Sequence, residues 1–273
     1  MMDSFEHRAE EAEEAEDLQT ALELWKELAA KSSEPAFFIR YGSVARKLEK
    51  WQEAEDAFAQ ALHLDPTSSL VMENMGILWL NRTDKGDADS LQTAKRWFLR
   101  SLNLDRHARL LTLLGAAYMA LDESEAARGA LEEALRRDPA YEEALYNLAV
   151  IEEETDPLRS VELLERAIQI DPDYAAAHQV LGRVYQGMAD LIRADYHFRR
   201  SLEIDPADYW SNLYLANLLG VQGREAEAEQ VYRFATHLHP EIAGGLEIFA
   251  RFLESIGKNG EAATMRAQLK PSD

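Results

Sequence analysis

The fold is decided by a short stretch that recurs along the chain, first as Ala61-Leu62-His63-Leu64-Asp65-Pro66. Similar stretches begin at Ser101, Ala134, Ala167, Ser201 and Ala235, and most of them end in Asp-Pro. Their last residues are 40, 33, 33, 34 and 34 residues apart. Proline lacks a backbone N–H and disfavours helical geometry in the residue before it, so each stretch predicts the end of a helix. The chain is therefore expected to repeat one helical unit of nearly constant length.

The residues between these helix ends repeat as well. The clearest unit runs from Ala175 to Asp208, and units from Pro35 and Tyr209 share its pattern of small and large residues. In its two helices it carries Leu181, Gly182, Tyr185, Ala194, Phe198 and Ser201. This pattern resembles the tetratricopeptide repeat. The resemblance implies an all-α solenoid of antiparallel helix pairs that forms a right-handed superhelix, in which Gly182 lets two helices approach closely.

The repeats cover the chain with weaker copies at both ends. Residues 35–242 hold six clear repeats. Residues 1–34 form an acidic, degenerate N-terminal repeat with a second helix over Thr20–Ala30, and residues 243–273 form a C-terminal capping repeat. A solenoid needs polar outer ends. No linker rich in glycine, proline or serine divides the chain, so we expect a single elongated domain over residues 1–273.

Two departures from the regular unit are informative. The chain is longer around Asn81–Asp89, where we expect an inserted turn that could contact a partner. A calcium site at Asp84, Asp87 and Asp89 is the weaker alternative, because their spacing is not that of an EF-hand. The unit from Glu142 has a shorter turn, where Asp156 is the expected N-cap and Pro157 the first helical residue.

Charge limits the partners. The net charge is −21, and the first 20 residues hold eight acids against Arg8. Ala9, Ala12 and Ala15 recur at helical spacing beneath them, which favours a solvated helix face over an acidic arm that meets a basic partner. Because so negative a field repels phosphate backbones, nucleic acid is not an expected partner. We see no signal peptide and no membrane span, and expect a cytoplasmic protein.

No pattern for catalysis is visible. The chain has no cysteine, no phosphate-binding glycine loop and no nucleophile or zinc-protease signature, so we expect no catalytic residue, no cofactor and no metal. His237 and His239 are better explained as a solvated helix end than as metal ligands. His178 stands where other units have a larger apolar residue, and we expect a core or groove histidine there rather than a catalytic one.

The remaining function is protein binding, and the repeat geometry predicts where. The first helix of each pair leaves one face on the inner surface, which tetratricopeptide families use for peptides and proteins. This face holds five basic and six acidic residues, so its acidity is far below that of the whole chain. The predicted groove residues are Leu70, Ile77, Arg109, Tyr146, Val150, Gln179, Arg183, Trp210, Leu213, Asn217 and Arg251. Trp210 and Tyr146 are the expected energetic anchors.

Two functions follow as hypotheses. The first is an adaptor or scaffold that binds a partner segment in the groove. The alternative is an assembly subunit or homo-oligomer that docks through its ends or convex face. The clamp by which some tetratricopeptide domains grip chaperone tails is not expected, because Ile39 and Ser43 occupy the places of its lysine and asparagine.

Overall fold

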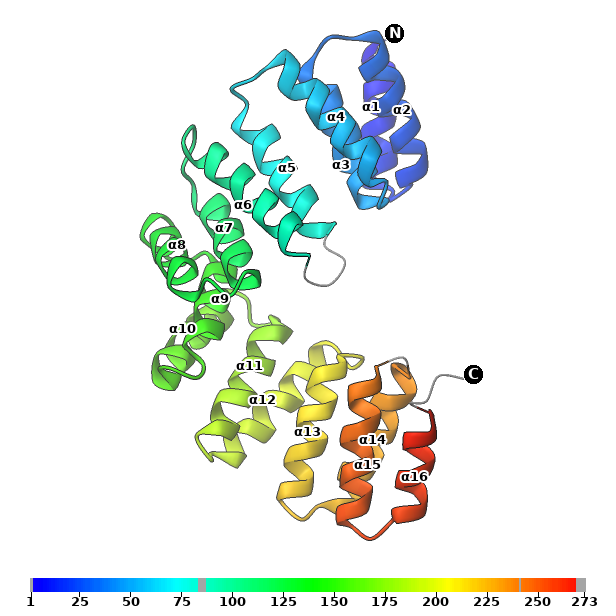
Figure 1. Ribbon diagram of the computed structural model, residues 1–273, viewed down its shortest axis with the longest axis vertical. Helices are drawn as coiled ribbons and strands as arrows, with labels where there is room; N and C mark the ends of the chain where they lie inside the picture. Colours follow the sequence, from blue (N-terminus) through cyan, green and yellow to red (C-terminus); the bar gives the residue numbers. More distant parts are fainter. Residues whose placement is uncertain (1, 83–86, 241, 269–273) are drawn as a thin grey trace. The chain divides into compact units, whose positions relative to one another are not determined.

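The computed structural model describes residues 2–82, 87–240 and 242–268. These residues form sixteen α-helices and no strand (Figure 1). The chain divides into two compact units, residues 1–147 and 148–273, and the boundary falls inside helix α9 (Glu142–Glu152) rather than in a linker. The fold is thus all-α, as predicted, whereas the expectation of one continuous domain stays a prediction.

The helices follow one another in pairs, joined by short turns. The first unit holds the helices α1 (Met2–Glu14), α2 (Leu18–Lys31), α3 (Pro35–Lys47), α4 (Trp51–Leu64), α5 (Ser69–Asn81), α6 (Ala88–Leu102), α7 (Ala108–Ala120) and α8 (Ser124–Arg137). The second unit holds the helices α10 (Pro157–Ile170), α11 (Ala175–Gly187), α12 (Leu191–Ile204), α13 (Tyr209–Val221), α14 (Glu225–Leu238), α15 (Ala243–Ser255) and α16 (Asn259–Gln268).

The predicted helix ends are confirmed, and in four of the six stretches the aspartate accepts a hydrogen bond in the turn that follows. Helix α4 ends at Leu64, and Asp65 follows with an extended backbone. The Asp65 carboxylate then accepts a hydrogen bond from the backbone N–H of Thr67 at 3.0 Å. Asp138, Asp171 and Asp205 repeat this contact two residues onward, at 2.9–3.0 Å. The aspartate therefore closes a turn of its own before the next helix begins.

Small residues in the first helix of a pair meet large residues in the second, as the sequence pattern predicted. A Cβ atom added at Gly182 would overlap the ring of Phe198, and one at Gly42 would lie 2.7 Å from Phe58. Both phenylalanines are completely buried. Even alanine fits at these positions only if the ring moves.

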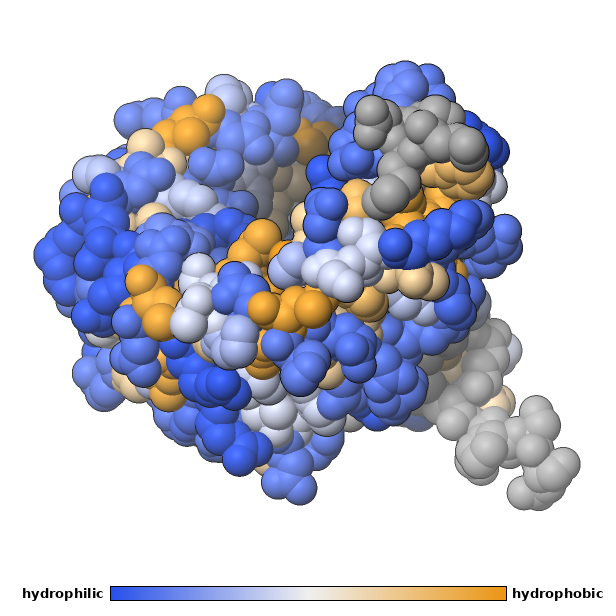
Figure 2. All heavy atoms as spheres, turned by 90° about the horizontal axis from the view of Figure 1, so that it is seen from above, coloured by the Kyte–Doolittle hydropathy of each residue, from blue (hydrophilic) through white to orange (hydrophobic). Residues whose placement is uncertain are grey.

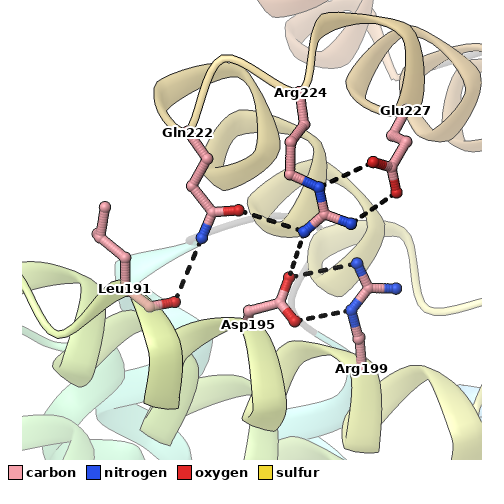
Figure 3. A network of polar contacts seen from close by, with 6 residues as sticks. All are labelled: Leu191, Asp195, Arg199, Gln222, Arg224 and Glu227. Carbon is pink, nitrogen blue, oxygen red and sulfur yellow. Dashed lines mark hydrogen bonds and ion pairs between the residues drawn. The ribbon is translucent and has the colours of Figure 1, made fainter.

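Neighbouring repeats are joined by buried hydroxyls and by surface ion pairs. The Ser201 and Ser211 hydroxyls lie 2.9 Å apart in the core. On the surface, Asp195 of α12 pairs with Arg199 at 2.8 Å and reaches Arg224, which begins the next second helix, at 3.5 Å (Figure 3). The Arg224 guanidinium also donates to Glu227 at 2.6 and 2.8 Å. These polar links fix the register of one pair on the next.

The terminal repeats are packed helix pairs. In the first, Ala9 and Ala12 are buried, and the indole of Trp25 donates to the Glu13 carboxylate at 2.5 Å. Helix α1 is therefore a packed helix, with Glu11 and Glu14 exposed and Glu13 turned towards Trp25. In the last, Arg266 of α16 donates to Glu247 and Glu254 of α15, which places polar groups at that end of the unit.

An aspartate caps the helix that follows each of the two irregular turns. Asp156 accepts from the backbone N–H of Arg159 at 3.1 Å and caps α10, as predicted. In the long turn, Asp87 caps α6 through the N–H of Asp89 at 3.1 Å. Residues 83–86, including Asp84 of the calcium alternative, lie outside the described residues.

Candidate functional site

The second unit contains a cavity of about 710 Å³ between the first helices of adjacent pairs. Helix α13 provides most of one side and α15 the other, while Gln186 of α11 and Glu225 and Tyr232 of α14 complete it. The residues of α13 and α15 that line it are Trp210, Leu213, Tyr214, Asn217, Gly220, Val221, Ile248, Arg251, Phe252, Ser255 and Ile256. The lining is mostly apolar with a few polar groups, the composition of many binding pockets.

Aromatic rings form one side of the cavity. Trp210 is 49% exposed, and its ring stacks on Tyr214 with centroids 6.3 Å apart. The guanidinium carbon of Arg183 lies 5.6 Å from the centre of the same Tyr214 ring. A cation over an aromatic face is attracted by the ring quadrupole, and both partners lose freedom. Trp210 is thus held in place while much of its surface stays open.

Polar side chains around the cavity are already paired. The amide of Gln186 donates to Asn217 Oδ1 at 3.1 Å. Asn217 also bonds to the hydroxyl of Tyr232, whose pKa is raised to about 12 mainly by burial. Arg251 pairs with Glu247 at 3.0 Å. The cavity therefore has orienting polar groups, and Glu225 adds a negative charge to its lining.

Four of the predicted groove residues line this cavity: Trp210, Leu213, Asn217 and Arg251. Leu213 is only 3% exposed, so it forms the wall rather than an open contact. The other predicted residues of the second unit do not line the cavity. Gln179 donates to Asp208 at 2.8 Å, Arg183 donates to Glu153 at 2.9 Å, and Val150 is half-buried in α9.

The remaining predicted residues belong to the first unit. Leu70 of α5 is 52% exposed, and Ile77 of the same helix is half-buried. Arg109 of α7 pairs with the buried carboxylate of Glu73 on α5. Tyr146 is half-buried in α9. None of these four side chains lines the cavity of the second unit.

Several cavity residues were not predicted from the sequence, among them Tyr214, Ile248 and Phe252. Tyr214 follows Trp210 by four residues, so a helical face that includes one includes the other. On α15 the predicted groove residue is Arg251, whereas the cavity is lined by Ile248, Arg251, Phe252 and Ser255. The lining face of α15 is therefore rotated towards Ile248 and Phe252, and the apolar spacing of these two residues was the available signal.

The buried polar groups of this unit include a pair of histidines. His178 and His197 are 5% and 8% exposed, and their Nδ1 atoms lie 3.0 Å apart. His178 is thus a core histidine, one of the two positions that the sequence allowed. Across the described part of the chain, no group of three or more residues of the kinds that bind metals lies together, and none of its helices is long and apolar enough to cross a bilayer.

Known structures share this architecture. A tetratricopeptide repeat protein from Parabacteroides merdae matches 92% of the chain and 98% of its own length, with a TM-score of 0.70 and 16% identity. A sequence model of the tetratricopeptide repeat matches residues 4–128. Residues 4–128 thus belong to the tetratricopeptide-repeat family, and the described helix pairs of the whole chain have the tetratricopeptide-repeat fold. A model of the coatomer epsilon subunit also matches, over residues 101–180.

Two further structures show how widely the tetratricopeptide fold is used. The anaphase-promoting complex hetero-tetramer Cut9–Hcn1 matches 85% of this chain and 46% of its own, with a TM-score of 0.75 and 15% identity. YrrB, a tetratricopeptide-repeat protein with an unusual peptide-binding site, matches 68% of this chain and 94% of its own length. Its TM-score is 0.51 and its sequence identity is 16%. Among curated proteins, none matches the chain significantly. At these identities the likeness establishes the fold alone.

Proposed function

We propose that this tetratricopeptide-repeat protein is an adaptor or scaffold whose second unit binds a segment of a partner protein in the cavity between α13 and α15. The observation that carries the proposal is an open, preorganised aromatic side: Trp210 is half exposed but fixed by its stacking on Tyr214. Exposed tryptophans in pockets are frequent anchors of protein interfaces. Catalysis forms no part of the proposal.

The chemistry of the cavity indicates what the segment presents. Its aromatic lining side chains are Trp210, Tyr214, Tyr232 and Phe252, and Val221 and Ile248 are 65% and 36% exposed. A volume of about 710 Å³ is within the range of ligand pockets and accommodates several bulky side chains. The Gln186–Asn217 pair offers hydrogen-bonding groups to a peptide backbone. We therefore expect a segment with clustered apolar side chains and a micromolar affinity, about −8 kcal/mol.

Two facts support a protein as the partner. Tetratricopeptide-repeat proteins generally bind other proteins, and YrrB, with the same fold, has a peptide-binding site. The net charge of −21 opposes binding to the phosphate backbone of nucleic acid.

Selection from a random peptide library on the whole protein tests the proposal. Peptides that bind the wild type are measured by titration calorimetry against Trp210→Ala, with Ile192→Ala as the matched control. Ile192 is 85% exposed on α12 and does not line the cavity. The proposal requires a loss of about 30-fold for Trp210→Ala, equivalent to about 2 kcal/mol, and a change below twofold for Ile192→Ala. Equal affinities for both variants would place binding elsewhere.

A second candidate, self-association, rests on exposed apolar side chains of second helices. Leu158 of α10 is 70% exposed, and Ile192 and Tyr196 of α12 are 85% and 61% exposed. On the face drawn in Figure 2, hydrophobic residues form small separate areas within a mostly hydrophilic surface. Sedimentation of the wild type and of Ile192→Asp tests this candidate. A concentration-dependent dimer that the variant abolishes supports it, and a monomer throughout removes it.

A further inference from the structure

One charge in the lining of the cavity has no ion-pair partner among the described residues. Glu225 lines the cavity from the first turn of α14 and is exposed. The adjacent Arg224 is held by Glu227 at 2.6 Å. Arg251, the other charged residue of the lining, pairs with Glu247 at 3.0 Å. The described part of the cavity therefore presents one uncompensated negative charge.

An aromatic ring lies at the same end of the cavity as Glu225. A Cβ atom added at Gly220, near the end of α13, would lie 3.2 Å from Phe252 Cε2. Glu225 begins α14 five residues after Gly220, across the short turn that joins the two helices. Tyr232 packs on the half-buried Phe252 with ring centroids 5.0 Å apart, which restricts the Phe252 ring. This end of the cavity therefore holds a fixed aromatic ring and a carboxylate.

This combination suits a guanidinium group. A cation is attracted to the face of an aromatic ring, and the planar guanidinium also stacks on it. A carboxylate accepts two parallel hydrogen bonds from the same group. Val221, which is 65% exposed at this end of α13, offers an apolar surface to the methylene groups of an arginine side chain. The ring, the carboxylate and the apolar surface thus match three parts of one side chain.

Trp210 lies at the other end of α13. It precedes Val221 by eleven residues, which corresponds to about 16 Å at about 1.5 Å per residue of helix. An extended chain covers about 3.3 Å per residue, so about five residues of a partner span this distance. A side chain that packs on Trp210 and an arginine that reaches Glu225 are therefore about five positions apart in an extended segment.

We propose that the partner segment bound by the second unit carries an arginine that binds between Glu225 and Phe252, about five residues from the side chain that packs on Trp210. The inference rests on the proposed function and specifies the chemistry of the partner. The net charge of −21 attracts basic segments to the chain as a whole, so the cavity determines the position of the arginine and not merely its charge.

The helix dipole accounts for part of the placement of Glu225. Acidic residues in the first turn stabilise a helix, and both Glu225 and Glu227 lie in the first turn of α14. Glu227, however, is turned towards Arg224 and does not line the cavity (Figure 3). Glu227→Gln is therefore the matched control for Glu225→Gln, because each variant removes one acid from the same helical turn.

The test uses the full chain and two defined peptides, acetyl-Phe-Ala-Ser-Ala-Ser-Arg-amide and its reverse, acetyl-Arg-Ser-Ala-Ser-Ala-Phe-amide. Each has a copy in which citrulline, a neutral residue of nearly the same shape, replaces the arginine. The indole N–H signal of Trp210 is followed by ¹H–¹⁵N NMR at constant ionic strength. The arginine peptide whose direction fits the cavity should shift this signal in a saturable way, with a dissociation constant on the order of millimolar. Its citrulline copy should bind about tenfold more weakly.

Two variants separate contact with Glu225 from long-range charge. Glu225→Gln should weaken binding of this arginine peptide about tenfold and change binding of its citrulline copy less than twofold. Glu227→Gln should change binding of either peptide less than twofold. Circular dichroism confirms that each variant is folded.

The outcomes distinguish this inference from the proposed function. Equal binding of the arginine and citrulline peptides, or equal weakening by Glu225→Gln and Glu227→Gln, would overturn the inference while the shift of the Trp210 signal still reported a bound peptide. No saturable shift with any of the four peptides would overturn it as well. The proposed function fails separately, in the library experiment, where Trp210→Ala would bind the selected peptides as tightly as Ile192→Ala.

Discussion

Lowering the pH from 7 to 5 should weaken the second unit through its buried histidine pair. His178 of α11 and His197 of α12 lie side by side with their ring centroids 5.3 Å apart, and the Tyr185 ring stacks on His197 at 5.5 Å. His178 also hydrogen-bonds to the backbone at Pro172. The contact between the two Nδ1 atoms suits neutral rings, because one Nδ1 can then donate and the other accept, whereas two protonated rings would both donate.

The magnitude follows from the pKa of His197. Burial, together with His178 and Arg193, lowers that pKa from 6.5 to about 4. Burial, opposed by the bond to Pro172, also lowers the pKa of His178. Both values are lowered in the folded state, so the unfolded chain binds more protons below pH 6.5. Stability is therefore full above pH 6.5 and is lost as the pH falls towards 4. For His197 alone the loss between pH 7 and pH 5 is about 2 kcal/mol.

Urea unfolding followed by circular dichroism measures this loss. The wild type is compared with the double variant His178→Phe/His197→Phe, whose rings are of similar size. The positions equivalent to 178 in the two preceding repeats hold Leu111 and Leu145. Carboxylates titrate alike in both proteins, so their contribution cancels. The free energy of unfolding should fall about 2 kcal/mol more in the wild type. An equal fall in both proteins would refute the assignment of the pH dependence to this pair.

Three further predictions concern the repeat itself. Gly182→Ala should destabilise the protein by about 1 kcal/mol, because the clash of its Cβ with the buried Phe198 ring outweighs the gain in helix propensity. Gly129→Ala lies at an exposed site of α8 with nothing within 4 Å of its Cβ, and should stabilise the protein by about 0.5–1 kcal/mol. Thermal unfolding that gave both variants the same sign would contradict this. Asp156→Ala removes the cap of α10 and should cost about 1 kcal/mol in urea unfolding, whereas Glu123→Ala, before α8, where no side chain caps the helix, should cost less than half of that. Arg224→Gln breaks the exposed network of Figure 3 and should lower the free energy of unfolding by less than about 1 kcal/mol, and by less again at about 1 M salt. A larger loss that salt does not change would show that the network is more than a surface contact.

The sequence was sufficient for the fold because its signals are local and repeated. Asp65 and Pro66 end a helix by backbone chemistry alone, and Gly182 with Phe198 marks a close approach between two helices of one pair. The site was predicted less fully. Trp210 and Asn217 were found from their register on α13, but Ile248 and Phe252 were missed, because the rotation of α15 depends on packing against its neighbours.

The most direct test of the central claim is the position at which a native partner touches the protein. A photo-reactive benzoylphenylalanine is placed at position 217, in the cavity, or at position 192, on the exposed surface of α12, in the full chain inside its native cells. Residue-level mass spectrometry then identifies the cross-linked segment. We expect one protein segment, rich in apolar side chains, to be cross-linked at position 217. Its cross-link at position 192 should be absent or at least tenfold lower in yield. A partner cross-linked at position 192 and not at position 217 would contradict it.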